Sequence, residues 1–564
     1  MELADGFWAP RQLQLRDHTL PVMLERLERA GAVDAFRRLG PEPTTGERRG
    51  LWFSDSDLFK WMEAAARAGR LDLLDPIIEL IPRAQHLDGY LHSFYDAGPG
   101  SQARYSDLTS SHELYCGGHF VEAALAHHAA TGETVLLDIA HRWADHVCAT
   151  FGPGRDERTD GHPKVELALA RLASATGEAR YLEHARWTIE AQLANVGQSV
   201  DDVDLAGHTV KALYLASGIA EVARATNDER WRAAATRLFT SLVDEHAYPT
   251  GAVGGRWLDE SVGRPFELPD AMAYAESCAA VASVQFARRV WELTGEPRAL
   301  DHVELLLYNA VPCGVGADGE SWFYCQPHAV PEDARESNPW VAPFEYGPSM
   351  LLSWSPPRRH RWFDVACCPT NLARLFATVP DHVADIDETG DLRIHLPLAA
   401  RIRGDSWDVE ITGAYPDDGA GRVRVHASPA GRVVRVRIPG WAGGDGHREL
   451  GPDGRVDLPV ADEWWETDRR VEGAAGTVYL RRGPVVRCVE GIDTPGVDLR
   501  RIVVDPARAT AEAFARVPAT GDRLHRRATV EPPVLEPLPD LRTVAYHAWA
   551  NRGPTPMRYR FPRR

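Results

Sequence analysis

The chain has 564 residues, 44% of them hydrophobic, and a formal net charge of −18. This length exceeds one ordinary domain, so two or three domains are expected. The negative charge argues against binding to nucleic acid and favours a small or neutral partner.

The N-terminus shows no export or membrane signal. The opening residues, MELADGFWAPRQ, have neither a basic region nor an apolar one, and no apolar run reaches the length of a membrane span. From the sequence we therefore expect a cytoplasmic protein that does not contact a membrane.

The first two-thirds of the chain repeats a helical pattern. Apolar-periodic runs are interrupted by short stops that begin at Thr131, Thr176, Thr226 and Thr294, at intervals of 45, 50 and 68 residues. Each stop contains glycine or asparagine, which is typical of helix ends. Repeated helical hairpins of this length predict a solenoid or a closed toroid, and we expect an (α/α)6 barrel over residues 1–381.

Three Gly-His pairs recur in this region, each expected just before a helix. They contain His119, His162 and His208. In a closed toroid the equivalent ends of the inner helices share one rim, so these histidines could line a common cavity. The alternative is that each one only satisfies a helix end or fills the core.

The pattern changes after residue 381. Segments such as WDVEIT and GRVRVHA alternate with a period of two and are separated by Gly, Asp and Pro. This is typical of strands, and residues 382–564 are expected to form one β-sandwich or two small ones.

The segment WFDVACCPTNLAR contains adjacent cysteines, Cys367 and Cys368. Adjacent cysteines rarely bridge each other, because the small ring strains the disulfide. Pro369 follows them, and Asn371 is predicted to cap the helix that comes next, so the pair is expected in a loop entering a helix.

Glu276 and Cys278 are candidate partners of this pair. At the irregular start of a helix their side chains could turn to one point, and one oxygen with three sulfurs would suit Zn²⁺. The spacing alone does not establish such a site, because neither E-x-C nor C-C is a standard ligand motif.

The chain resembles the β-L-arabinofuranosidases of glycoside hydrolase family 127 and their relatives. The resemblance runs nearly end to end, through FWAPRQ, DSDLFKWMEAAA, HELYCGGHFVEAA, GHPKVELALARL, GHTVKALYL, AYAESCA, ACCPTN and RIPGWA. It implies a retaining exo-glycosidase, with a small oligosaccharide or other glycoside as its substrate and zinc as its cofactor.

The resemblance also implies the role of each site residue. Cys367 would be the nucleophile, and Glu276, Cys278 and Cys368 would join it as zinc ligands. The acid/base glutamate of the family lies sixteen residues before the E-x-C glutamate, which is Glu260 here. The residue before it is Asp259, where the family usually has glycine. The three Gly-His histidines and Tyr324 would contact the sugar.

Other functions stay open at this point. Relatives act on other unusual sugars, including an acidic one, for which Arg256 and Arg264 beside Glu260 could supply positive charge. A carbohydrate-binding protein with a structural zinc is an alternative of another class. The Trp- and Pro-rich loop within residues 328–360 could shape the leaving-group side, and a homodimer is left open. Sugar epimerases also use helical toroids, but they need no thiolate metal site.

Overall fold

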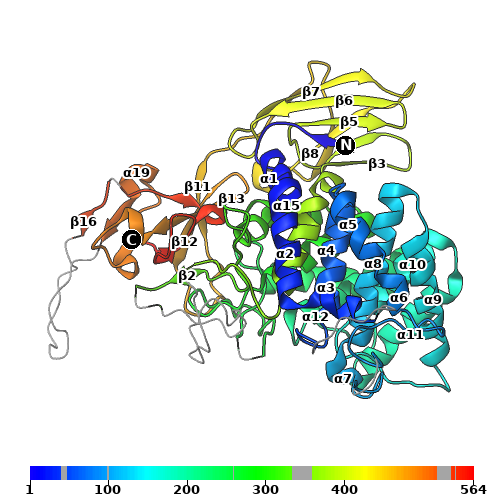
Figure 1. Cartoon of the computed structure of the whole chain (residues 1–564). Coiled ribbons are helices and arrows are strands. Elements are labelled where there is room, and N and C mark those ends of the chain that lie inside the picture. The colour runs from blue at the N-terminus through cyan, green and yellow to red at the C-terminus, as the bar shows by residue number, and fades with distance from the viewer. Residues whose placement is uncertain are drawn as a thin grey trace, which may run out of the picture.

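The computed structural model describes residues 1–39, 48–97, 101–257, 259–332, 334, 358–516, 535–539 and 541–564. A helical part comes first and a β-rich part follows (Figure 1). None of the helices in these ranges has the length and apolar character needed to cross a membrane.

Six helices of the described chain form a closed inner ring, because each packs on the next and the last packs on the first. They are α4 (Asp55–Arg67), α8 (Glu113–Thr131), α10 (Val165–Thr176), α12 (Thr209–Thr226), α14 (Ser277–Thr294) and α18 (Cys367–Ala377). This ring confirms the predicted (α/α)6 barrel.

An outer layer of helices alternates with the inner ring along the chain. It consists of α2 (Leu20–Ala30), α5 (Leu71–Ile78), α9 (Val135–Thr150), α11 (Ala179–Asn195), α13 (Glu229–Ser241) and α15 (Pro297–Tyr308). Shorter helices connect them: α1 (Ala9–Gln14), α3 (Ala32–Arg37), α6 (Ile81–Ala84), α7 (Leu108–Ser111) and α16 (Ala310–Cys313).

The predicted helix stops are confirmed. Inner helices α8, α10 and α14 end at Gly132, Gly177 and Gly295, and α12 ends at Asn227. All four residues have a left-handed backbone, which glycine and asparagine adopt most readily. The repeated stops that begin at threonine and contain glycine or asparagine therefore mark the ends of the inner helices.

The strands form two separate groups of sheets (Figure 1). The first group holds a five-stranded sheet, ordered β1 (Glu2–Leu3), β5 (Ala400–Gly404), β6 (Trp407–Gly413), β7 (Ala420–Ala427) and β10 (Arg455–Asp457). Its second sheet is ordered β3 (Ala384–Ile386), β4 (Leu392–Ile394), β8 (Val434–Ile438) and β9 (Gly446–Glu449). Alternate residues of β6 are buried, as the period of two predicts.

The second group lies apart from the first in Figure 1. Its larger sheet is ordered β11 (Asp462–Glu466), β12 (Thr477–Arg482), β13 (Val485–Glu490), β18 (Met557–Arg558) and β2 (Ala329–Val330), with β17 (Val544–Ala545) on β13 and β19 (Arg560–Pro562) on β12. The smaller sheet contains β14 (Ile502–Val504), β15 (Phe514–Arg516) and β16 (Glu536–Pro537), near the short helix α19 (Thr510–Ala513).

Two strands from the first two-thirds of the chain join these later sheets. Glu2 and Leu3 pair with Arg401 and Ala400 of β5, and Val330 pairs with Met557 of β18. The division into domains at residue 381 stays a prediction, with a last helical turn at Val379–His382 and a first later strand at Ala384–Ile386.

Candidate active site

Four predicted metal ligands come together inside the barrel. One donor atom from each of Glu276, Cys278, Cys367 and Cys368 lies within 4.8 Å of the others. Cys368 Sγ is 3.3 Å from Cys278 Sγ and 3.9 Å from Cys367 Sγ. Glu276 Oε1 lies 3.6 Å from Cys367 Sγ and 3.5 Å from Cys368 Sγ. Two segments 89 residues apart in the sequence, ending at Cys278 and beginning at Cys367, thus supply one cluster.

Glu276 and Cys278 reach the cluster because the backbone changes direction between them. Glu276 is extended and pairs with Cys325 as an isolated bridge, and α14 begins at Ser277. Cys278 then points from the first helical turn. The preceding Ala275 has φ of +38°, an uncommon conformation for a residue with a side chain. The expected irregular helix start is confirmed.

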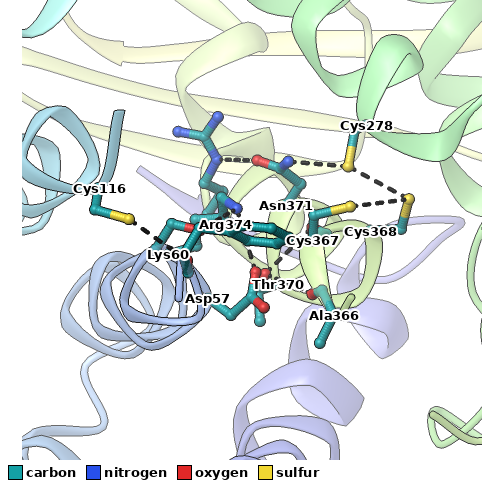
Figure 2. Close-up of polar contacts among 12 residues, drawn as sticks. Asp57, Lys60, Cys116, Cys278, Ala366, Cys367, Cys368, Thr370, Asn371 and Arg374 are labelled. Carbon is teal, nitrogen blue, oxygen red and sulfur yellow. Dashed lines mark hydrogen bonds and ion pairs between the residues drawn. The ribbon is translucent and has the colours of Figure 1, made fainter. Parts of the chain in front are cut away.

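Cys367 and Cys368 are the first two residues of α18. The prediction that the pair lies in a loop before the helix is therefore wrong, and Pro369 lies inside the first turn, where its missing N–H costs little. Asn371 is not a helix cap. It lies fully buried in the helix, and its side-chain nitrogen is 3.1 Å from Cys278 Sγ (Figure 2).

Glu260 lies beside this cluster and contacts His208. Glu260 Oε2 is 2.7 Å from His208 Nε2, and Glu260, His208 and Glu276 form a second close group. Glu260 has φ of +55°, and its carbonyl oxygen accepts hydrogen bonds from the backbone N–H and hydroxyl of Thr209. The glutamate loop is thus tied to the start of α12.

The three predicted histidines gather around two tyrosines. The His162 ring centroid is 4.3 Å from that of Tyr115 and 5.9 Å from that of His208, and the His119 centroid is 4.7 Å from that of Tyr115. Tyr214 contacts His119 and His162. The His119 side chain is fully buried, and neither of its ring nitrogens has a hydrogen-bond partner within the described residues.

His119 does not precede a helix as predicted, because α8 already begins at Glu113. The early start has a long-range cause. Asp160 Oδ2 accepts hydrogen bonds from the backbone N–H groups of Leu114 and Tyr115, at 2.8 and 3.2 Å. Free N–H groups at a helix start need such acceptors. His162 lies before α10, and His208 caps α12, as expected.

The surroundings of Cys367 favour its thiolate. Burial alone raises a thiol pKa, but hydrogen bonds from Cys278 and Cys368, the positive charge of Lys60 and the Tyr324 hydroxyl hold the pKa of Cys367 well below its usual range. Tyr324 Oη is 3.5 Å from Cys367 Sγ. Burial, together with the charges of Cys367 and Glu260, raises the pKa of Glu276 well above its usual range.

The cluster fits a tetrahedral zinc ion. With a Zn–S bond of about 2.3 Å and a Zn–O bond of about 2.0 Å, two sulfurs are separated by about 3.8 Å, and a sulfur and an oxygen by about 3.5 Å. The 3.9 Å sulfur pair and the 3.5 and 3.6 Å sulfur–oxygen pairs match these values, whereas the Cys278–Cys368 sulfur pair, at 3.3 Å, is about 0.5 Å shorter. Two of the three thiols and the carboxyl are buried and Cys367 is half-buried. A divalent cation would offset the negative charge of these four groups when they are deprotonated.

Some neighbours of the cluster were not predicted as site residues. Tyr274 Oη lies 3.2 Å from Glu276 Oε2, and Lys60 Nζ is fully buried 3.3 Å from Asp57 Oδ1. Burial raises the pKa of Asp57 to about 6, although Lys60 opposes this. The available signal was a lysine three residues after an acid within the run of α4, which is otherwise apolar from Leu58 to Met62.

The two arginines flanking Glu260 are engaged elsewhere. Both guanidinium groups pair with Glu267: Arg256 Nη2 at 2.8 Å and Arg264 Nε at 3.4 Å. Glu267 thus offsets one of the two positive charges on which the acidic-sugar alternative depended.

Two further features lie outside the site. A cleft of 1420 Å³ runs past Phe266, Trp441 and Trp465, and none of the predicted site residues lines it. Most of the loop predicted to shape the leaving-group side, residues 335–357, lies outside the described residues.

Comparison with protein families agrees with this geometry. Residues 1–381 match the model of the β-L-arabinofuranosidase GH127 catalytic domain, and residues 463–560 match that of the glycoside hydrolase family 127 C-terminal domain. The chain belongs to glycoside hydrolase family 127. It is therefore a glycoside hydrolase, and the predicted family is confirmed.

Individual members of family 127 are similar over nearly their whole length. A non-reducing end β-L-arabinofuranosidase of Bifidobacterium longum subsp. longum is 31% identical, with 90% of this chain and 88% of the relative covered. A crystal structure of a GH127 β-L-arabinofuranosidase from Geobacillus stearothermophilus T6 is 30% identical, with a TM-score of 0.87 and coverage of 100% and 99%. A second solved structure, a GH127 β-arabinofuranosidase, is 25% identical, with a TM-score of 0.84 and coverage of 100% and 96%.

Proposed function

We propose that this family 127 enzyme is a retaining β-L-arabinofuranosidase that removes terminal L-arabinofuranose with Cys367 as nucleophile and Glu260 as acid/base. The names of its relatives support the substrate. The observation that carries the mechanism is the position of Glu276, which belongs both to the cysteine cluster and to the close group with Glu260 and His208. The Glu276 carboxylate thus lies within 4.8 Å both of the Cys367 sulfur, the candidate nucleophile, and of the Glu260 carboxylate, the candidate acid.

The first step transfers the sugar to sulfur. The Cys367 thiolate attacks the anomeric carbon, the glycosidic C–O bond breaks, and Glu260 donates its proton to the leaving oxygen. In the second step Glu260, now a carboxylate, removes a proton from water, the hydroxide attacks the same carbon, and the C–S bond breaks. Two displacements restore the starting configuration.

Zinc would be held by Glu276, Cys278, Cys367 and Cys368, and it would keep the thiols deprotonated at neutral pH. The remaining residues bind and orient. His119, with two unpartnered ring nitrogens, and His162, with Nε2 unassigned, suit sugar hydroxyls. Both ring nitrogens of His208 are engaged within the chain, by Glu260 and by the Lys211 N–H, so we propose that His208 acts by orienting Glu260. The Tyr324 hydroxyl, 3.5 Å from Cys367 Sγ, orients the sulfur.

An aryl β-L-arabinofuranoside tests the proposal. The wild-type enzyme should release β-L-arabinose first, seen by NMR before mutarotation, whereas Cys367→Ser should lose activity. Cys148→Ser, a partly buried thiol on the outer helix α9, is the matched control and should remain active. A folded, zinc-containing protein with no turnover on furanosides would favour the carbohydrate-binding alternative.

A cytoplasmic location remains part of this proposal and would suit short oligosaccharides as natural substrates. Fractionation of producing cells should recover the activity with cytoplasmic markers. Recovery from the medium or the cell envelope would contradict it.

A further inference from the structure

A buried hydrogen-bond chain runs from a cation to one sulfur of the cluster. Figure 2 shows it as consecutive dashed lines from Arg374 to Asn371 and from Asn371 to Cys278. Arg374 Nε donates to Asn371 Oδ1 at 2.7 Å, and Asn371 Nδ2 donates to Cys278 Sγ at 3.1 Å. The side chains of Cys278, Asn371 and Arg374 are each at most 1% exposed.

The orientation of the Asn371 amide is fixed by its neighbour. A guanidinium group can only donate hydrogen bonds, so the Asn371 oxygen must face Arg374 and its NH₂ group must face Cys278. The Tyr214 hydroxyl, 3.3 Å from the same oxygen, supports this orientation. The sulfur of Cys278 therefore receives a hydrogen bond.

Arg374 is itself held from three other inner helices. Its guanidinium contacts Glu63 Oε2 of α4 at 3.1 Å, Tyr214 Oη of α12 at 3.1 Å and Gln285 Oε1 of α14 at 3.4 Å. An arginine in so many contacts has no freedom to rotate, and its charge polarises the Asn371 amide.

The chain of bonds distinguishes the sulfurs. Within the described residues, the Asn371 side chain contacts the sulfur of Cys278 and not that of Cys367. The Cys367 sulfur has hydrogen-bond contacts with Glu276, Cys368 and Tyr324 instead. A donor to a ligand sulfur orients that ligand and draws charge from it. Cys278, the sulfur supported in this way, is like Cys368 a sulfur to which no step of the reaction is assigned.

We infer that Asn371 and Arg374 are positioning residues that hold Cys278 as a permanent zinc ligand, while Cys367 is left free of this restraint to react. The inference rests on the proposed function. It explains why Cys278 and Cys367, which belong to the same cluster, would have different roles.

Zinc release from the holoenzyme tests the inference. Outer hydrogen bonds of this kind typically change metal affinity by about 10–100-fold. Asn371→Leu, which keeps the volume but removes the donor, should release zinc to a chromogenic chelator at least about tenfold faster than wild type. Gln285→Met removes a different contact of Arg374 and should release zinc within about twofold of wild type.

Cobalt substitution separates a bond to sulfur from a general structural effect. In Co²⁺-loaded Asn371→Leu the sulfur-to-metal charge-transfer band should move to longer wavelength, because the sulfur has lost its donor. Asn371→Gln keeps a side-chain amide donor, so its band should lie nearer that of the wild type. Wild-type release rates together with an unshifted band in folded Asn371→Leu would overturn the inference. Failure of the wild-type chain to bind zinc would instead overturn the proposed function.

Discussion

Glu260 and His208 are joined by a hydrogen bond of 2.7 Å between Oε2 and Nε2, and the backbone reinforces the pair, since Thr209 N–H donates to the Glu260 carbonyl. The candidate acid/base is thus oriented by a residue at the start of an inner helix. Glu260 adopts a left-handed backbone to reach this position, which is a strained conformation that neighbouring contacts must maintain.

Removal of the acid should depend on the leaving group. Glu260→Gln should lower kcat by about 10²–10⁴-fold on an arabinofuranosyl disaccharide, which needs a proton on its leaving oxygen. The loss of kcat/KM, which reports the first step, should be much smaller on a nitrophenyl glycoside, whose leaving group departs as an anion. Its kcat should still fall, because Glu260 also activates the water of the second step. Equal losses of kcat/KM on both substrates would argue that Glu260 does not protonate the leaving oxygen.

The His208 contact can be removed without losing the helix cap. His208 Nδ1 accepts from Lys211 N–H, and asparagine is a good capping residue but too short to reach Glu260. His208→Asn should lower kcat/KM by at least about tenfold with little change in Tm. Combined with Glu260→Gln it should add little further loss, because the two residues act together. Fully additive losses would contradict this coupling.

The two adjacent cysteines should behave differently when changed to serine. Cys368→Ser should lose most of its zinc, measured by elemental analysis, and with it activity and stability. Cys367→Ser should keep the fold and retain at least part of the zinc, because Glu276, Cys278 and Cys368 remain, but should have no turnover. Identical zinc content and identical residual activity in the two variants would contradict the different roles proposed for Cys367 and Cys368.

The pair of Glu267 with Arg256 should make stability depend on pH. The hydrogen bond from Arg256 lowers the pKa of Glu267 from 4.5 to about 2. A lowered carboxyl pKa stabilises the fold above about pH 4.5, and this contribution is lost as the pH falls towards 2. Glu267 is partly exposed, so Glu267→Gln should cost only about 0.5–1 kcal/mol at pH 7.

Denaturant unfolding of wild type and Glu267→Gln between pH 7 and pH 3 checks this prediction. The difference in unfolding free energy should shrink as the pH falls below 4.5. A difference that is constant or grows with acid would show that the ion pair is not its source.

The sequence was sufficient for the barrel and for the cluster because both leave local signals. The helix stops at Gly132, Gly177 and Gly295 mark the hairpin repeat, and motifs around Cys278 and Cys367 carry the family resemblance. Comparison with family 127 then confirmed the family itself.

Features that depend on distant partners could not be predicted. Helix α8 begins early because Asp160, 46 residues after Leu114, caps it. Asn371 looks like a local helix cap, but its partner is Cys278, 93 residues away in the sequence. The pairing of Glu2 with Arg401 likewise leaves no local trace. In each case the local sequence around one residue of the pair gives no sign of its distant partner.

The central claim is that Cys367 carries the sugar between the two steps. The most direct measurement is to inactivate the enzyme with an epoxide analogue of L-arabinofuranose and to map the modified peptide by mass spectrometry. The account predicts one adduct per chain, on Cys367, and no adduct in Cys367→Ser. An adduct on Glu260 or Glu276, or unchanged labelling of Cys367→Ser, would contradict it.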